Sequence, residues 1–119
     1  MSWKEIYNHL RDHGYDVYSL GQHQGICKEP YLVLRDNGRT GPSYSLEAHE
    51  YEVLLYYPYN KYSAFAGYID AVKICMNELF PAVKYIGPEQ PHYPDDDVKG
   101  YMTSLIYQVT EIVNVNKIV

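Results

Sequence analysis

Residues 47–57, which read EAHEYEVLLYY, decide the fold. Every second residue from Tyr51 to Tyr57 is apolar, so an extended chain would present one continuous apolar face to a core. The opposite face carries Glu50 and Glu52 first and becomes apolar at Leu54 and Tyr56. We therefore predict a long strand, solvated on one face in its first half and covered on both faces in its second half.

A helix is predicted directly after this strand. Pro58 ends the strand, Ser63 is a candidate N-cap, and the helix is expected over residues 64–80 with Pro81 terminating it. Apolar side chains recur there at helical spacing, which is the clearest periodic signal in the chain. They are Phe65, Tyr68, Ile69, Val72, Cys75, Met76 and Leu79.

A second strand and a hairpin are predicted before residue 47. Pro30 opens a run, residues 31–35, that is apolar on both faces and therefore typical of a central strand. The run Asp36-Asn37-Gly38 and the pair Gly41-Pro42 are turn signals. Residues 36–45 are accordingly expected to form the flexible tip of a hairpin that leads into the long strand.

The N-terminal segment predicts a helix over residues 3–13. Ser2 and Glu5 have the spacing of a capping box, and Gly14 stands where a helix commonly stops. A short strand over residues 16–20 and a polar loop then lead to the central strand.

The C-terminal third predicts two further strands. The first covers residues 83–87, a proline-rich loop covers residues 88–99, and the last strand begins near Gly100. Its alternation continues almost to the C-terminus, far beyond a usual strand length. Residues 113–119 are therefore expected to overhang the sheet, with residues 110–119 acting as a C-terminal strand or arm.

The predicted order is α-β-β-β-α-β-β in a single domain over residues 1–119. Hairpin-like connections favour an α+β fold with a mainly antiparallel sheet of about five strands and two helices packed on one face. A chain of this length accommodates one domain with one core.

The composition excludes several classes of function. The formal net charge is −5 and the ten Lys and Arg residues are scattered, so no specific nucleic acid partner is expected. No apolar run is long enough to cross a membrane, and no signal peptide is recognised. Cys27 and Cys75 are therefore expected to be reduced thiols in a cytoplasmic fold.

The usual devices of catalysis are missing from the sequence. His9 and His13 stand one helical turn apart but lack a third ligand, and all five histidines are interpreted as surface residues. The run Asp95–Asp97 lacks calcium-loop spacing, and Cys27 with His23 lacks a group that would orient a nucleophile. We expect no catalytic, cofactor-binding or metal site, and a protein that is not an enzyme.

The chemistry that is present suits protein contacts. Fifteen residues are tyrosine, a side chain enriched at interfaces, and several of them fall in residues 54–62. An alternative reading places the strand half of that segment in the core and exposes only Tyr59 and Tyr62. Together with the hairpin tip, the acidic run and the C-terminal overhang, this segment defines the predicted subunit interface. Its residues are Arg35, Arg39, Tyr56, Tyr57, Tyr59, Tyr62, Asp95, Asp96, Asp97, Val113, Val115 and Ile118.

Three stretches of the sequence resemble a known family. They are GxxxGxCKEPYLVL at residues 21–34, YEVLLYYPYNKYS at residues 51–63, and PEQPHYPDDDVKGYMTSLIYQ at residues 88–108. Over about residues 3–109 this pattern resembles the small tail-terminator or tail-completion proteins of tailed bacteriophages, prophages and phage-tail-like bacteriocins of Gram-positive bacteria.

The resemblance implies a structural virion protein. Such proteins form a ring, usually of six subunits, at the head-proximal end of the tail, where the ring ends polymerisation of the tube and sheath. The implied partners are other copies of the chain, the tail tube, possibly the sheath, and the head–tail connector at the neck. The implied location is the virion tail or neck, and the host cytoplasm during assembly. DNA would pass through the ring without specific binding.

Two alternatives stay open. A head-completion or stopper protein of the neck belongs to the same structural class and differs in its contact partner. A small ligand-binding or enzymatic α+β domain belongs to a different class and would require an apolar cavity with converging polar groups.

Overall fold

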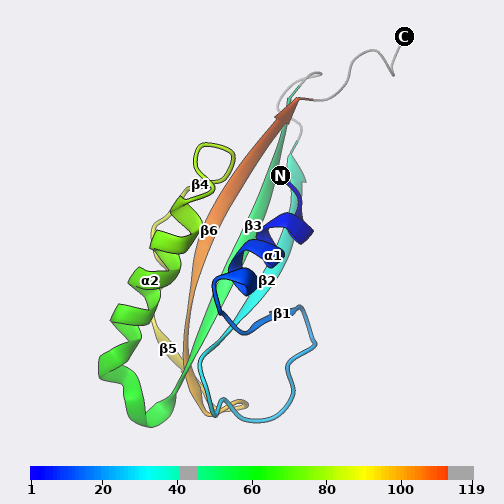
Figure 1. Cartoon of the computed structure of the whole chain (residues 1–119). Coiled ribbons are helices and arrows are strands. Elements are labelled where there is room, and N and C mark those ends of the chain that lie inside the picture. The colour runs from blue at the N-terminus through cyan, green and yellow to red at the C-terminus, as the bar shows by residue number, and fades with distance from the viewer. Residues whose placement is uncertain (41–45, 113–119) are drawn as a thin grey trace.

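The computed structural model describes residues 1–40 and 46–112, which form one layer of sheet and one layer of helices (Figure 1). The strands lie in the order β1-β2-β3-β6-β4, and β5 also pairs with β6. Only the β1–β2 pair is parallel among these pairings. The predicted α+β fold with a mainly antiparallel sheet is confirmed, with six strands in place of about five. In chain order the elements are α1 (Trp3–Asp12), β1 (Val17–Ser19), β2 (Tyr31–Thr40), β3 (Leu46–Pro58), the 3-10 helix η1 (Tyr59–Ala64), α2 (Phe65–Asn77), β4 (Lys84–Tyr85), β5 (Tyr93–Asp95) and β6 (Gly100–Ile112).

The long strand predicted from residues 47–57 is the centre of the sheet. β3 pairs with β6 along its whole length, from Leu46 opposite Ile112 to Pro58 opposite Gly100. On its other side β3 pairs with β2. Because β3 is hydrogen-bonded on both edges, its alternating side chains set the inner and outer faces of the whole sheet.

Both helices cover the same face of the sheet and enclose the main core. α1 begins as predicted, since the Ser2 hydroxyl accepts a hydrogen bond from the Glu5 amide and Gly14 adopts a positive φ after the helix ends. The predicted stripe on the second helix is also buried against the sheet. Fully buried members of this core include Ile6, Leu10, Leu32, Leu34, Tyr51, Val53, Leu55, Phe65, Val72, Met76 and Leu105.

A second, smaller core lies on the opposite face of the sheet. It is formed by Cys27, Tyr31, Val33, Leu54 and Met102. The polar loop before β2 covers this face and is fastened there by a hydrogen bond from the Cys27 amide to the Val98 carbonyl. The prediction that β2 is a central strand with two apolar faces is therefore confirmed.

The turn predicted at Asp36-Asn37-Gly38 is wrong. These residues belong to β2, and the register with β3 skips Asn37, which makes a β-bulge. The Asp36 carboxylate accepts a hydrogen bond from the Gly38 amide at 2.8 Å, and Gly38 has a φ of +98° that glycine adopts easily. Turn-forming residues thus produce a kink within a continuing strand. Residues 41–45, the rest of the predicted tip, lie outside the described residues.

The second helix is shorter than predicted at both ends. Ser63 is not its N-cap, because residues 59–64 form η1 and α2 begins at Phe65, capped by Ala64 without a side-chain hydrogen bond. α2 ends at Asn77, four residues before Pro81. A tight 3-10 turn therefore joins β3 to α2 where the sequence predicts a direct start.

The segment predicted as a loop over residues 88–99 contains β5 and lies along β6. Backbone hydrogen bonds run from the Ile86 amide to the Ile106 carbonyl and from the Gln90 amide to the Ser104 carbonyl. The strand predicted over residues 83–87 is reduced to the two residues of β4. Prolines interrupt regular pairing in this segment because they cannot donate to a ladder, yet the segment still covers most of the β6 edge. The predicted overhang, residues 113–119, lies outside the described residues.

No helix in the described part of the chain is long and apolar enough to span a membrane.

Candidate binding surfaces

Residues 54–62, called here the tyrosine-rich corner, lie where β3 passes into η1. The Tyr56 ring stacks on Tyr31 with centroids 4.6 Å apart in the second core, and Tyr57 stacks on Phe65 at 5.4 Å in the main core. Tyr62 is about half exposed and packs on Tyr101 at 4.6 Å. The strand half of residues 54–62 thus contributes to packing within the chain, and its η1 half lies at the surface.

The acidic run, Asp95–Asp97, is held in a turn by hydrogen bonds within the chain. The Tyr59 hydroxyl donates to Asp96, and the Asp97 amide donates to the Asp95 carboxylate at 3.1 Å. The hydrogen bond to Asp96, reinforced by burial, raises the pKa of Tyr59 to about 12. Two of the three carboxylates therefore fasten β5 and η1, and the third, Asp97, is exposed.

The ends of β2, β3 and β6 form a three-stranded arm, defined here as residues 36–40, 46–50 and 109–112. The arm lies at the end of the sheet where β3 begins and β6 ends (Figure 1). His49 is buried in it, with its Nε2 atom 2.6 Å from the Asp36 carboxylate and its ring 4.3 Å from Tyr51. Burial opposes the charge of Asp36, but the Gly38 amide and His49 outweigh it and keep the pKa of this carboxyl below its usual value. The bulge is thereby pinned to β3.

The two arginines predicted at the interface belong to β2. Arg39 forms a long ion pair of 3.8 Å with Glu47 on β3, and both side chains are exposed enough for this pair to contribute little. Arg35 lines a groove of about 390 Å³ on the face of the sheet opposite the helices. Leu54, Tyr93 and Met102 form apolar parts of the same groove, which places Arg35 beside the second core.

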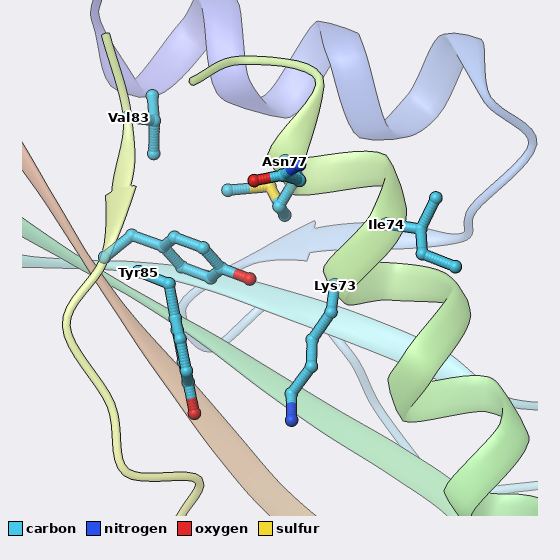
Figure 2. Close-up of a pocket in the computed structure, with 7 residues that line it drawn as sticks. Lys73, Ile74, Asn77, Val83 and Tyr85 are labelled. Carbon is cyan, nitrogen blue, oxygen red and sulfur yellow. The ribbon is translucent and has the colours of Figure 1, made fainter. Parts of the chain in front are cut away.

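A separate groove of about 310 Å³ lies between α2 and β4. Figure 2 shows Lys73, Ile74 and Asn77 projecting from the helix, with Val83 and Tyr85 on the strand side. Its lining is mostly apolar, and its one cationic group, the Lys73 ammonium, lies 5.5 Å from the centre of the Tyr85 ring. Its mostly apolar lining can hold an apolar group, and its polar side chains are Lys73, Asn77, Tyr85 and Tyr107.

Lys73 belongs to a polar network that sequence reasoning missed. Its ammonium donates to Glu89 at 2.9 Å, and the other Glu89 oxygen lies 2.6 Å from His92. The Tyr62 hydroxyl lies 3.0 Å from the other ring nitrogen of His92. This network links α2, η1 and the segment before β5. Lys73 and Glu89 are 16 residues apart in the sequence, and Tyr62 and His92 are 30 apart, so no local spacing in the sequence predicts the network.

Replacing Glu89 with Gln should lower the free energy of unfolding by about 1 kcal/mol at pH 7. Burial raises the pKa of Glu89, but Lys73 and His92 outweigh burial and lower it overall. Because the folded pKa is lowered, the carboxylate stabilises the fold above its unfolded pKa of about 4.3, and the effect is lost as pH falls further. Urea unfolding at pH 7 and pH 3 measures the difference, which should be smaller at pH 3.

Asp70→Asn is the matched control for this variant. Asp70 lies exposed on the same helix and, within the described residues, forms no direct ion pair, although its charge acts on Lys73 from a distance. We expect its substitution to change the stability by less than about 0.5 kcal/mol at either pH. An equal loss in both variants would show that the network around Glu89 contributes nothing specific.

The histidines do not all lie at the surface, and that prediction is wrong for His49. His23 is half-buried and stacks on Tyr31 with centroids 3.7 Å apart. Burial raises the pKa of both thiols, Cys27 and Cys75, to about 11. A thiol with a raised pKa is a poor nucleophile at neutral pH, because the thiolate is the reactive form.

Comparison of the sequence with models of known protein families and with curated proteins finds no match.

Proposed function

We propose that this chain is a structural subunit that assembles head-to-tail into a ring of the tail-terminator type. In this role it caps the head-proximal end of a phage or phage-like tail, ends polymerisation of the tube and any sheath, and joins the tail to the neck. The observation that carries the assembly part of the proposal is the pair of open strand edges on the arm.

The two edges belong to different strands. β1 pairs with β2 only from Leu32 to Leu34, so no described strand pairs with the outer edge of β2 from residue 35 onward. On the other side, β4 pairs with β6 only at Tyr107 and Gln108, so the outer edge of residues 109–112 has no described strand partner. Unpaired N–H and C=O groups on such edges are templates for a strand of another chain.

Two different edges favour a ring over a simple dimer. A contact between the β2 edge of one copy and the β6 edge of the next uses unlike surfaces, and repeating such a contact generates a closed ring or an open filament. β2 and β6 both run antiparallel to β3, so they point in the same direction. Adding copies side by side would therefore make a parallel strand pair at each junction and continue the sheet from one subunit to the next.

The sequence resemblance supports the more specific role at a phage tail. A net charge of −5 is compatible with a ring whose channel does not hold DNA tightly. The exposed half of the tyrosine-rich corner, around Tyr59 and Tyr62, lies at the opposite end of β3 from the arm and offers a second surface for the tube or connector. The predicted interface residues Val113, Val115 and Ile118 lie outside the described residues.

Cysteine cross-linking tests the head-to-tail contact. Arg35→Cys or Asn37→Cys introduces a thiol beside the open edge of β2, and Thr110→Cys introduces one on β6. Asn37 donates to Glu50 and Glu52, and Thr110 pairs with Ala48, so both thiols lie on the face opposite the helices. Under oxidation at high protein concentration, chains carrying both cysteines should form disulfide-linked multimers larger than dimers.

The single-cysteine variants are the controls. In a head-to-tail assembly the two β2 edges never meet, so each single variant should stay free of covalent multimers. Within one chain the two positions are separated by β3, which leaves them about 9–10 Å apart or more, beyond the reach of a disulfide. Efficient dimerisation of either single variant would contradict the proposal, as would a chain that remains monomeric by light scattering at high concentration.

A ligand-binding role is the competing proposal, and the α2–β4 groove is the observation that favours it. The polar group that the groove offers, the Lys73 ammonium, is already engaged by Glu89. A binding site generally needs convergent polar groups to orient its ligand, and this groove supplies few. A strictly monomeric protein that binds a metabolite in this groove would favour the competing role.

A further inference from the structure

Two helices bring four potential metal ligands together at the edge of the main core. His9 and His13 lie one turn apart on α1, and Cys75 lies in the last turn of α2, three residues before Glu78. One donor atom from each of His9, His13 and Cys75 lies within 4.8 Å of the others. The sequence offers the histidine pair no third ligand nearby, and the fold places a candidate beside it, Cys75, from 62 positions further along the chain.

Glu78 lies beside the two histidines on the solvent side of this cluster and is the candidate for a fourth donor. Its Oε1 atom lies 3.0 Å from the His13 Nε2 atom and 3.8 Å from the His9 Nε2 atom. Solvent exposure increases across these residues. The Cys75 thiol is buried, the His9 imidazole is mostly buried, and the side chains of His13 and Glu78 are about half exposed. An ion can thus enter from solvent and reach the sulfur.

The hydrogen bonds of His13 orient its ring for coordination. Its Nδ1 atom donates to the His9 carbonyl at 2.7 Å, which leaves Nε2 directed at the cluster. In many metal sites a histidine donates a hydrogen bond from one ring nitrogen to a backbone carbonyl and coordinates the metal with the other. His9 contacts the Cys75 carbonyl through Nε2 at 2.8 Å, a bond that it would exchange for the metal.

We propose that His9, His13, Cys75 and Glu78 form a structural zinc site that joins α1 to α2. Two imidazole nitrogens, a thiolate and a carboxylate are all common zinc ligands, and four of them complete a tetrahedron. Metal–ligand bonds of about 2.0–2.3 Å place neighbouring donor atoms roughly 3.3–3.6 Å apart. The donor atoms of His9, His13 and Cys75 lie within 4.8 Å of one another, so they must approach by up to about 1.5 Å, and the half-exposed side chains of His13 and Glu78 can move to complete the site. On binding, zinc replaces the proton of the Cys75 thiol, which passes to solvent.

The site would stabilise the contact between α1 and α2 and would not be a catalytic centre. Four protein ligands leave no open position for a water or substrate, which is the arrangement of structural zinc sites. Its residues belong to α1 and to the end of α2, and none of them belongs to the edges of β2 and β6 that carry the proposed assembly. The inference therefore stands or falls independently of the proposed function.

Titration with Co²⁺ tests the site, because Co²⁺ takes zinc-like geometry and its bond to a thiolate gives a charge-transfer absorption. The reduced wild-type protein should develop this absorption and the intense visible bands of tetrahedral Co²⁺, and Zn²⁺ should abolish both. Cys75→Ser should lose the charge-transfer absorption. His13→Gln, a substitution at an exposed position that leaves the core intact, should weaken Co²⁺ binding at least tenfold.

Cys27→Ser is the matched control. Cys27 is the other buried thiol and lies in the second core on the opposite face of the sheet. Its replacement should leave the absorption and the affinity unchanged, with circular dichroism confirming the fold of every variant. The proposal is overturned if the wild-type protein shows no thiolate absorption with excess Co²⁺, or if Cys27→Ser loses it while Cys75→Ser retains it.

Discussion

Replacing Phe65 with Ala should lower the free energy of unfolding by about 3–5 kcal/mol. Phe65 is the first residue of α2 and is 0% exposed. Its ring packs against Tyr57 at 5.4 Å and His92 at 5.1 Å, so truncation would leave a cavity where β3, α2 and the segment before β5 meet. Chemical denaturation followed by circular dichroism measures the loss, which should approach the entire stability of an ordinary domain.

Ile74→Ala is the control for this prediction. Ile74 lies on the same helix but is 69% exposed, so its truncation removes little buried surface. We expect a change of at most about 0.5–1 kcal/mol. If Phe65→Ala cost no more than Ile74→Ala, α2 could not be packed on the sheet through the stripe described above.

Replacing Tyr31 with Ala should lower the free energy of unfolding by roughly 3 kcal/mol or more. Tyr31 is 2% exposed and is the centre of the second core. Its ring is stacked between His23 at 3.7 Å and Tyr56 at 4.6 Å, with Tyr18 edge-on at 5.7 Å. Burial raises the pKa of this phenol, which agrees with a ring enclosed by the polar loop and the sheet.

The same measurement on Tyr93→Ala separates packing from tyrosine chemistry. Tyr93 lies in β5 and is 50% exposed, so the same chemical change there should cost about 1 kcal/mol or less. Equal losses at the two positions would mean that the loop before β2 does not seal the second face of the sheet. The large effect expected at Tyr31 depends on that seal.

These two predictions bear on whether the chain needs partners to be stable. Both faces of the sheet are covered near the middle of β3, one by helices and the other by a loop. The open surfaces lie at the two ends of β3, in the arm and around η1. The assembly proposed above would use these ends and not the covered faces, so the chain is expected to fold alone, and the cysteine variants before oxidation should be as stable as the parent chain.

The sequence by itself determined the elements whose signals are local. The alternation in residues 47–57 predicted β3, the helical stripe from Phe65 to Leu79 predicted the buried face of α2, and Ser2 with Glu5 predicted the start of α1. Each of these signals depends on the period of one element and on its end groups, which are properties of neighbouring residues. The α+β class followed from the order of these elements.

Only the tertiary structure decided the features that join distant residues. The run Asp36-Asn37-Gly38 reads as a turn, but pairing with β3 extends the strand through it and leaves a bulge pinned by His49. Cys75 approaches His9 and His13 because both helices pack on the same sheet face, a proximity that no spacing in the chain encodes. The open edges of the arm likewise depend on where β1 and β4 stop pairing, which is decided by the whole sheet and not by any single strand.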